Sequence, residues 1–232
     1  MIALSEISKP EAARYMGVSG IPDRATMELL DKYEPIVRRN LRPAFVYRET
    51  ALEFLPEGVR LAGIGSPLKG NDVKRHLEGC SRAVVFAATV SSEADKLIRS
   101  IAVTDVAGAL AVDCLCSAAI EQTCEKVEAE IFSTMSAAYR TWRFSPGYGD
   151  LPISSQRELL LFLNAQRRIG LTVTENFLMI PSKSVTAIIG ISDSPLSAQK
   201  KGCDICRMRD RCNFRKNDMT CTDFSGSTGS EK

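Results

Sequence analysis

The sequence feature that most constrains the fold is a long, alanine-rich helical pattern running from Val103 to about Tyr139. Alanine is the strongest helix former, and helices of this length exceed the usual length in globular proteins. The other elements must therefore pack around it, and we expect one long central helix as the spine of the fold. Its most apolar part, "VAGALAVDCLCSAAI", contains Asp113 and is too short to span a bilayer.

Shorter elements are expected on both sides of this helix. Helical patterns occupy "SKPEAARYMG", the segment after Pro22 (bent or ended at Pro35), "NDVKRHLEGC", the stretch after "SSEAD" and "SSQRELLLFLNAQRRIG". Strand patterns occupy "PAFVYRE", "GVRLAGIG", "RAVVFAAT", "LTVTENFLMI" and "SVTAIIGIS". Because the elements do not alternate as regular βαβ units, we predict an α+β fold with a mixed or antiparallel sheet.

Charge and leader patterns limit the possible settings of the chain. Its 232 residues carry a net charge of +2, so the molecule as a whole lacks the strong positive charge that is typical of proteins that bind nucleic acid or membrane surfaces. The start, "MIALSEISKPEAARYM", has no basic region followed by an apolar one, so no signal peptide is expected. We therefore predict a soluble, cytoplasmic protein. A single histidine, His76, excludes histidine-pair metal sites.

In a reducing compartment, each of the eight cysteines is core filler, a metal ligand or a reactive thiol. Cys114, Cys116 and Cys124 lie within the long helix and are expected in the core, where free cysteine behaves as a small hydrophobic residue. No partner is evident for Cys80. The sequence thus assigns the helical cysteines to packing.

The C-terminal cysteines form a different pattern. We divide the chain into a domain over residues 1–192, a cysteine-rich metal-binding segment over 193–224 and a disordered tail over 225–232. Cys203, Cys206, Cys212 and Cys221 have the spacing C-x2-C-x5-C-x8-C, which predicts a four-thiolate site for zinc or for an iron–sulfur cluster. The alternative is four unligated thiols. Nearby Lys and Arg residues would offset thiolate charge, but they also permit binding to nucleic acid or to an acidic partner.

The stretch "RFSPGYGDLPISSQ" between two helical segments has features that a linker does not need. The guanidinium of Arg143 suits a carboxylate or a phosphate. Pro146 and Gly147 allow close approach of the backbone, and Tyr148 offers a flat face with a polar tip. These residues predict a loop that binds a small molecule with a carboxylate and an aromatic ring. An interhelix turn pinned by one arginine ion pair would show the same pattern.

Together, "RFSPGYGDLP" and "RRIGLTVTENFLMIPSKSV" resemble the C-terminal reactivation domain of cobalamin-dependent methionine synthase. That family has an Arg-x-Ala-Pro-Gly-Tyr loop, a helix, and an Ile-Gly-…-Thr-Glu-Ser-Phe-x-Met-x-Pro segment in the same order. The preceding half, with "GCSRAVVFAATVSSEADKLIRS" and the long helix, resembles short free-standing relatives of that domain. The resemblance extends to Ser192. Ser145 replaces the family alanine, and "ISDSPLSAQ" lacks the family's tyrosine pair.

The resemblance implies binding of S-adenosylmethionine and transfer of its methyl group to cobalamin that has been oxidised to cob(II). It implies the following ligand-binding residues: Arg143 for the carboxylate, Ser145, Pro146 and Gly147 through their backbone, Tyr148, and Glu121 on the long helix. It implies no catalytic acid or base, since an activated methyl group and a strong nucleophile need only positioning.

Two functions of different classes follow from the resemblance. The first is a stand-alone reactivation subunit of a multi-chain methionine synthase, acting on cobalamin held by a partner protein, with a separate electron donor protein as a further possible partner. The alternative is a non-catalytic accessory or docking protein for a corrinoid protein in another methyl-transfer pathway. For the cysteine-rich tail there are two hypotheses. It binds an iron–sulfur cluster that passes an electron to cobalt, or it binds zinc as a knuckle that docks the partner. A nucleic-acid binder is a third, weaker hypothesis.

Overall fold

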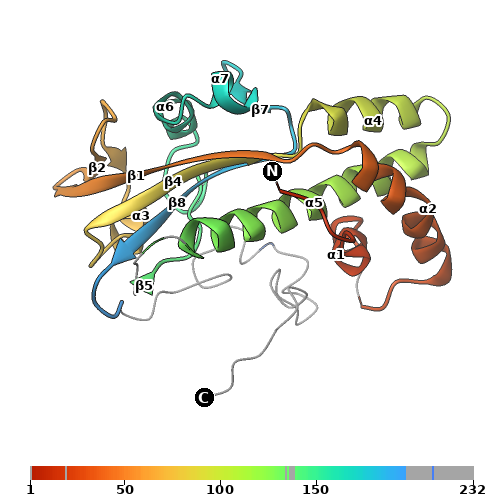
Figure 1. Ribbon diagram of the computed structural model, residues 1–232, viewed down its shortest axis with the longest axis horizontal. Coiled ribbons are helices and arrows are strands. Elements are labelled where there is room, and N and C mark those ends of the chain that lie inside the picture. The colour runs from red at the N-terminus through yellow and green to blue at the C-terminus, as the bar shows by residue number, and fades with distance from the viewer. Residues whose placement is uncertain (1, 19, 134, 136–138, 197–210, 212–232) are drawn as a thin grey trace.

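The computed structural model describes residues 2–18, 20–133, 135, 139–196 and 211. A six-stranded sheet with the order β3-β2-β1-β4-β8-β5 forms its centre, and every strand pair in it is antiparallel. The strands are β1 (Ala44–Leu55), β2 (Gly58–Leu61), β3 (Leu68–Lys69), β4 (Arg82–Thr89), β5 (Tyr139–Arg140) and β8 (Ser184–Ser192). Helices pack against this sheet (Figure 1), so the α+β class is confirmed and the sheet is antiparallel.

Helices cover both faces of the sheet. On one face lie α1 (Lys9–Tyr15), α2 (Arg24–Asn40), α4 (Ser92–Ala102) and α5 (Val106–Ser133). On the other lie α3 (Asn71–His76), α6 (Ser155–Phe162) and α7 (Ala165–Ile169). Figure 1 shows α6 and α7 on the opposite side of the sheet from α5. The fold therefore has three layers and two hydrophobic cores.

Strand β4 separates these two cores. It pairs along its whole length with β1 and with β8, and its sequence "RAVVFAAT" is almost continuously buried. Successive side chains of a strand point to opposite faces. Thus Val84 and Phe86 enter the core under α5, whereas Val85 and Ala87 enter the core under α6 and α7. An apolar run without alternation is what a strand buried on both faces requires.

The long helix α5 is shorter than the sequence pattern predicted. It begins at Val106 rather than Val103, because Asp105 ends the preceding turn and accepts a hydrogen bond from the amide of Gly108 at 2.7 Å. It ends at Ser133, and Tyr139 belongs to strand β5 instead. The predicted limit applied to "VAGALAVDCLCSAAI" alone, whereas the whole helix has 28 residues and is long and apolar enough to cross a membrane by length and composition. In the fold, 61% of its most apolar window is buried, as in the core helix of a globular domain.

Two predictions in the C-terminal half were wrong in detail. The segment "SSQRELLLFLNAQRRIG" is two helices, because Asn164 adopts a left-handed conformation between α6 and α7. The segment "LTVTENFLMI" is a tight hairpin of β6 (Thr172–Val173) and β7 (Met179–Ile180), with Phe177 at positive φ in its turn. By contrast, "SVTAIIGIS" coincides with β8.

The N-terminal half follows the predicted pattern more closely. Helix α1 has Ser8 as its N-cap, and α2 runs through Pro35 to Asn40 instead of ending there. The segment "GVRLAGIG" contributes only β2. The predicted metal ligands Cys203, Cys206, Cys212 and Cys221, and the tail over 225–232, lie outside the described residues.

Candidate functional site

One face of α5 carries three carboxylates at helical spacing: Glu121, Glu125 and Glu128. Positions four and three residues apart lie above one another on a helix surface. Cys124 lies among them in sequence but is buried, so the row runs along the edge of the core. This row of carboxylates is where the chain places Arg143.

Arg143 bridges two of these carboxylates. Its Nη1 lies 3.1 Å from Oε2 of Glu121, and its Nε lies 2.6 Å from Oε1 of Glu128. The three side chains are between 21% and 34% exposed, so these ion pairs are partly shielded from water. Arg143 directly precedes Phe144, which exchanges backbone hydrogen bonds with Ile188 of β8. The edge of the sheet therefore fixes the backbone that carries the guanidinium.

Burial sets the protonation behaviour of this cluster. It raises the pKa of Glu128 above the ordinary value, against the opposing effect of Arg143 and Arg140. It also raises the pKa of the Cys124 thiol to about 12. Burial alone would lower the pKa of Arg143, but Cys124 and the two glutamates raise it. The guanidinium therefore stays charged at any ordinary pH.

The residues after Arg143 form a compact turn. The amide of Tyr148 donates to the carbonyl of Ser145, and the amide of Gly147 donates to the carbonyl of Leu151. Gly147 has φ of +93°, a conformation that favours glycine. Pro146 is buried, whereas Tyr148 is 53% exposed and its ring packs beside Trp142 and Phe144. The turn thus presents one aromatic ring at the surface.

Helix α1 closes the neighbouring side of the carboxylate row. Arg14 pairs with Glu11 at 3.2 Å and lies over the ring of Tyr15. Burial raises the pKa of Tyr15 to about 12, and the charges of Glu121 and Glu11 add to this effect. Burial likewise raises the pKa of Glu11, with Glu121 and Glu125 contributing. Helix α1 packs directly on α5, the helix that carries Glu121, and this packing brings the charges together.

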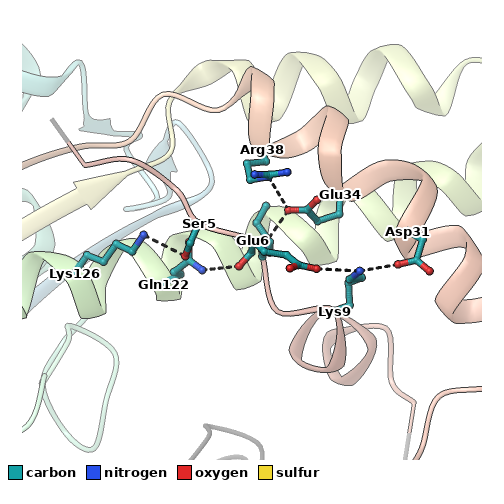
Figure 2. Close-up of polar contacts among 9 residues, drawn as sticks. Ser5, Glu6, Lys9, Asp31, Glu34, Arg38, Gln122 and Lys126 are labelled. Atoms are coloured by element: carbon teal, nitrogen blue, oxygen red, sulfur yellow. Dashed lines mark hydrogen bonds and ion pairs between the residues drawn. The ribbon is translucent and has the colours of Figure 1, made fainter.

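The segment before α1 is anchored by a polar network (Figure 2). Gln122 and Lys126 on α5 donate to the carbonyls of Glu6 and Ala3, at 2.9 and 2.7 Å. Glu34 on α2 accepts from the amide of Ile7 at 3.0 Å, and Lys9 pairs with both Glu6 and Asp31. These contacts fix the start of α1 against α2 and α5.

The structure brings part of the predicted site together. Arg143 and Glu121 are in direct contact, and Ser145, Pro146, Gly147 and Tyr148 form the adjoining turn. Among the residues the structure describes, no group of three or more His, Cys, Asp or Glu side chains could hold a metal ion. The predicted metal ligands are not among them.

Sequence reasoning missed Glu128, the second carboxylate partner of Arg143, and the residues of α1 that lie near Glu121. Glu128 could have been found, because it lies two helical turns after Glu121. Glu11, Arg14 and Tyr15 gave no such signal, since only the packing of α1 on α5 brings them near. His76, the single histidine of the sequence, is buried and shares a 2.8 Å hydrogen bond with Thr141.

Comparison with known proteins shows which family and which fold the chain is similar to. Residues 84–195 match the family model described as "Vitamin B12 dependent methionine synthase, activation domain". The fold is similar to that in the "Crystal Structure of the MetH Reactivation Domain bound to AdoHcy", with a TM-score of 0.62 and 17% identity, over 94% of this chain and 83% of that one. No curated protein matches the chain significantly in sequence. The matched residues of this chain include α5, the turn that follows Arg143, and β8.

Proposed function

We propose that this chain, whose residues 84–195 match the activation-domain family of vitamin B12-dependent methionine synthase, is a stand-alone reactivation subunit. It would act in the cytoplasm, where it would bind S-adenosylmethionine and support reductive remethylation of cobalamin that a separate partner protein holds. The observation that carries the proposal is this match, which includes the turn with Arg143 and the exposed Tyr148.

The charges of this cluster fit the ligand. S-adenosylmethionine has a carboxylate, an ammonium group and a sulfonium centre. Arg143 is the cation suited to the carboxylate, and the row of Glu121, Glu125 and Glu128 suits the two positive centres. The ligand carboxylate would share Arg143 with Glu121 or Glu128. Tyr148, whose side chain is 53% exposed, offers an aromatic ring for the adenosyl group.

The residues of this chain bind and orient; they need no proton transfer. S-adenosylmethionine supplies an activated methyl group, which leaves sulfur without its bonding electron pair, and the reduced cobalt provides the pair for the new bond. A separate one-electron donor produces that reduced cobalt from the cob(II) state. In-line positioning is therefore the contribution expected of Arg143 and its turn.

We propose in addition that Cys203, Cys206, Cys212 and Cys221 bind a metal. An iron–sulfur cluster would serve electron delivery to the partner, and zinc would serve docking. A purified protein with visible absorbance that is lost on reduction supports the cluster. A colourless protein with one zinc per chain supports the docking site.

The test of the main proposal is calorimetric titration of anaerobically purified protein with S-adenosylmethionine. The wild type should bind, and Arg143→Ala should bind roughly tenfold to a hundredfold more weakly, as expected for loss of a charge-assisted contact. Arg60→Ala is the matched control. Its guanidinium pairs with Glu53 on the β1–β2 hairpin and should not affect binding.

The competing function is an accessory protein that docks a corrinoid protein without using the ligand. One observation favours it: Arg143 already has two protein carboxylates as partners, as in a purely structural turn. No binding by the wild type at millimolar ligand would support this alternative and contradict ours. Equal binding by wild type and Arg143→Ala would contradict the role of Arg143.

A further inference from the structure

The turn that carries Arg143 and Tyr148 is joined to α3 by two facing aspartates. The carboxylate of Asp150 accepts from the amides of Asn71 and Asp72, at 2.7 and 2.9 Å. In return, the carboxylate of Asp72 accepts from the amide of Asp150 at 3.0 Å. We call this pair of aspartates the aspartate clamp. It joins residues 78 positions apart in sequence.

The aspartate clamp takes the place of a local helix cap. The N-cap residue of α3 is Gly70, which has no side chain to accept hydrogen bonds from the first helical amides. Such amides need an acceptor, and a carboxylate at a helix N-terminus is also favoured by the helix dipole. Asp150 therefore caps α3 from the turn, and the free amides of α3 in exchange fix the position of Asp150.

Two glycines make this close approach possible. Gly70 and Gly149 both have positive φ, of +135° and +51°. A Cβ atom on Gly70 would overlap the carboxylate of Asp150, and one on Gly149 would overlap the carboxylate of Asp72. The backbone on both sides of the aspartate clamp is thus compatible with glycine and with no larger residue.

The other end of α3 contacts the other end of the turn. His76, the last residue of α3, hydrogen-bonds Thr141 and stacks on Phe144 with 4.7 Å between ring centroids. It also meets the edge of Trp142, which in turn packs beside Tyr148. Helix α3 therefore contacts the chain before Arg143 through His76 and after Tyr148 through the aspartate clamp.

We infer that Asp72 and Asp150 are positioning residues for the ligand site. They hold the turn between Thr141 and Asp150 against α3, so that Arg143 and Tyr148 are in place before the ligand arrives. The expected effect of these residues on ligand binding rests on the proposed function. Their expected effect on the position of the turn is independent of it. Preorganisation of this kind lowers the ordering cost of binding.

The test uses Trp142 as an internal probe, because it is the only tryptophan of the chain and lies beside Tyr148. Its fluorescence would be recorded without ligand for the wild type, Asp150→Ala and Asp150→Asn, and S-adenosylmethionine affinity would be measured for each at a temperature where all are folded. Asp23→Ala is the matched control. Asp23 caps α2 through the amide of Thr26 and takes no part in the clamp.

We expect Asp150→Ala to change the Trp142 emission and to weaken binding about tenfold, within the range of a lost helix cap. Asp150→Asn keeps one carbonyl acceptor and should restore part of both signals. Asp23→Ala should change neither. Unchanged emission in Asp150→Ala, or changed emission with unchanged affinity, would overturn the inference. If the wild type itself does not bind, the proposed function fails, while the emission still reports on the clamp.

Discussion

At the scale of single residues, the cluster around Arg143 depends on small differences in burial. Glu121 and Glu128 both contact the guanidinium. Burial raises the pKa of Glu128 above its ordinary value, against the opposing charge of Arg143. A carboxyl whose pKa is raised on folding is protonated more readily in the folded chain than in the unfolded one. Its contribution to stability is present below the ordinary pKa of 4.5 and declines as pH rises through the raised folded value.

Glu128→Gln should remove this pH dependence. The free energy of unfolding of the wild type, compared with that of Glu128→Gln, should fall as pH increases upward from about 4.5. Urea denaturation of both proteins between acid and neutral pH measures the difference. Glu130→Gln, an exposed position on the same helix, is the control and should follow the wild type. A wild type that gains stability over Glu128→Gln with rising pH would contradict the raised pKa.

At the scale of elements, the start of α5 shows how packing overrides propensity. Asp105 accepts hydrogen bonds from the amide of Gly108 and from the hydroxyl of Tyr33, both at 2.7 Å. These contacts join α2 to the beginning of α5. A Cβ atom on Gly108 would overlap both the Tyr33 hydroxyl and the Asp105 carboxylate. Glycine within this helix is therefore a packing requirement.

Gly108→Ala tests the balance between the two effects. Alanine favours a helix over glycine by about 1 kcal/mol, whereas overpacking costs about 1–3 kcal/mol. We expect a net loss of roughly 1 kcal/mol in the free energy of unfolding, measured by urea denaturation. Gly65→Ala, where no atom lies within 4 Å of the added Cβ, should leave stability nearly unchanged. A stabilised Gly108→Ala would show that propensity prevails.

At the scale of the whole molecule, the described part of the fold buries four of the eight cysteines. Cys80, Cys114, Cys116 and Cys124 are buried as free thiols, as the sequence predicted for the three in the long helix. Burial raises the pKa of Cys116 and Cys124 to about 12, and that of Cys80 and Cys114 to about 11. Because the thiolate is the reactive form, these thiols should be inert in the native protein.

Alkylation at pH 8, followed by mass spectrometry, tests this division. The four buried cysteines should remain unmodified until the chain is unfolded. If the proposed metal site is present, Cys203, Cys206, Cys212 and Cys221 should be protected in the native protein and become reactive after chelation or cluster oxidation. Rapid modification of Cys124 in the native protein would contradict its burial, and immediate modification of all four tail cysteines would contradict the metal proposal.

Local sequence patterns predicted the helices and strands that are apolar over most of their length. The strand "RAVVFAAT", the strand "SVTAIIGIS" and the long alanine-rich helix were recognised from composition alone, because each is buried over most of its length. The hairpin over 171–180 and the break at Asn164 were missed. Both depend on single residues with positive φ, and the hydrophobic periodicity of a sequence does not indicate the backbone conformation of a single residue.

The sequence by itself determined the α+β class, the family resemblance, and Arg143 and Glu121 as candidate ligand-binding residues. These follow from residue types and spacings along one stretch of chain. Only the tertiary structure decided that Glu128 shares Arg143, that α1 flanks Glu121, and that Asp150 caps α3. Each of these depends on contact between segments that are distant in sequence. An antiparallel sheet with helices on both faces creates such contacts, and the local sequence pattern does not indicate which segments meet.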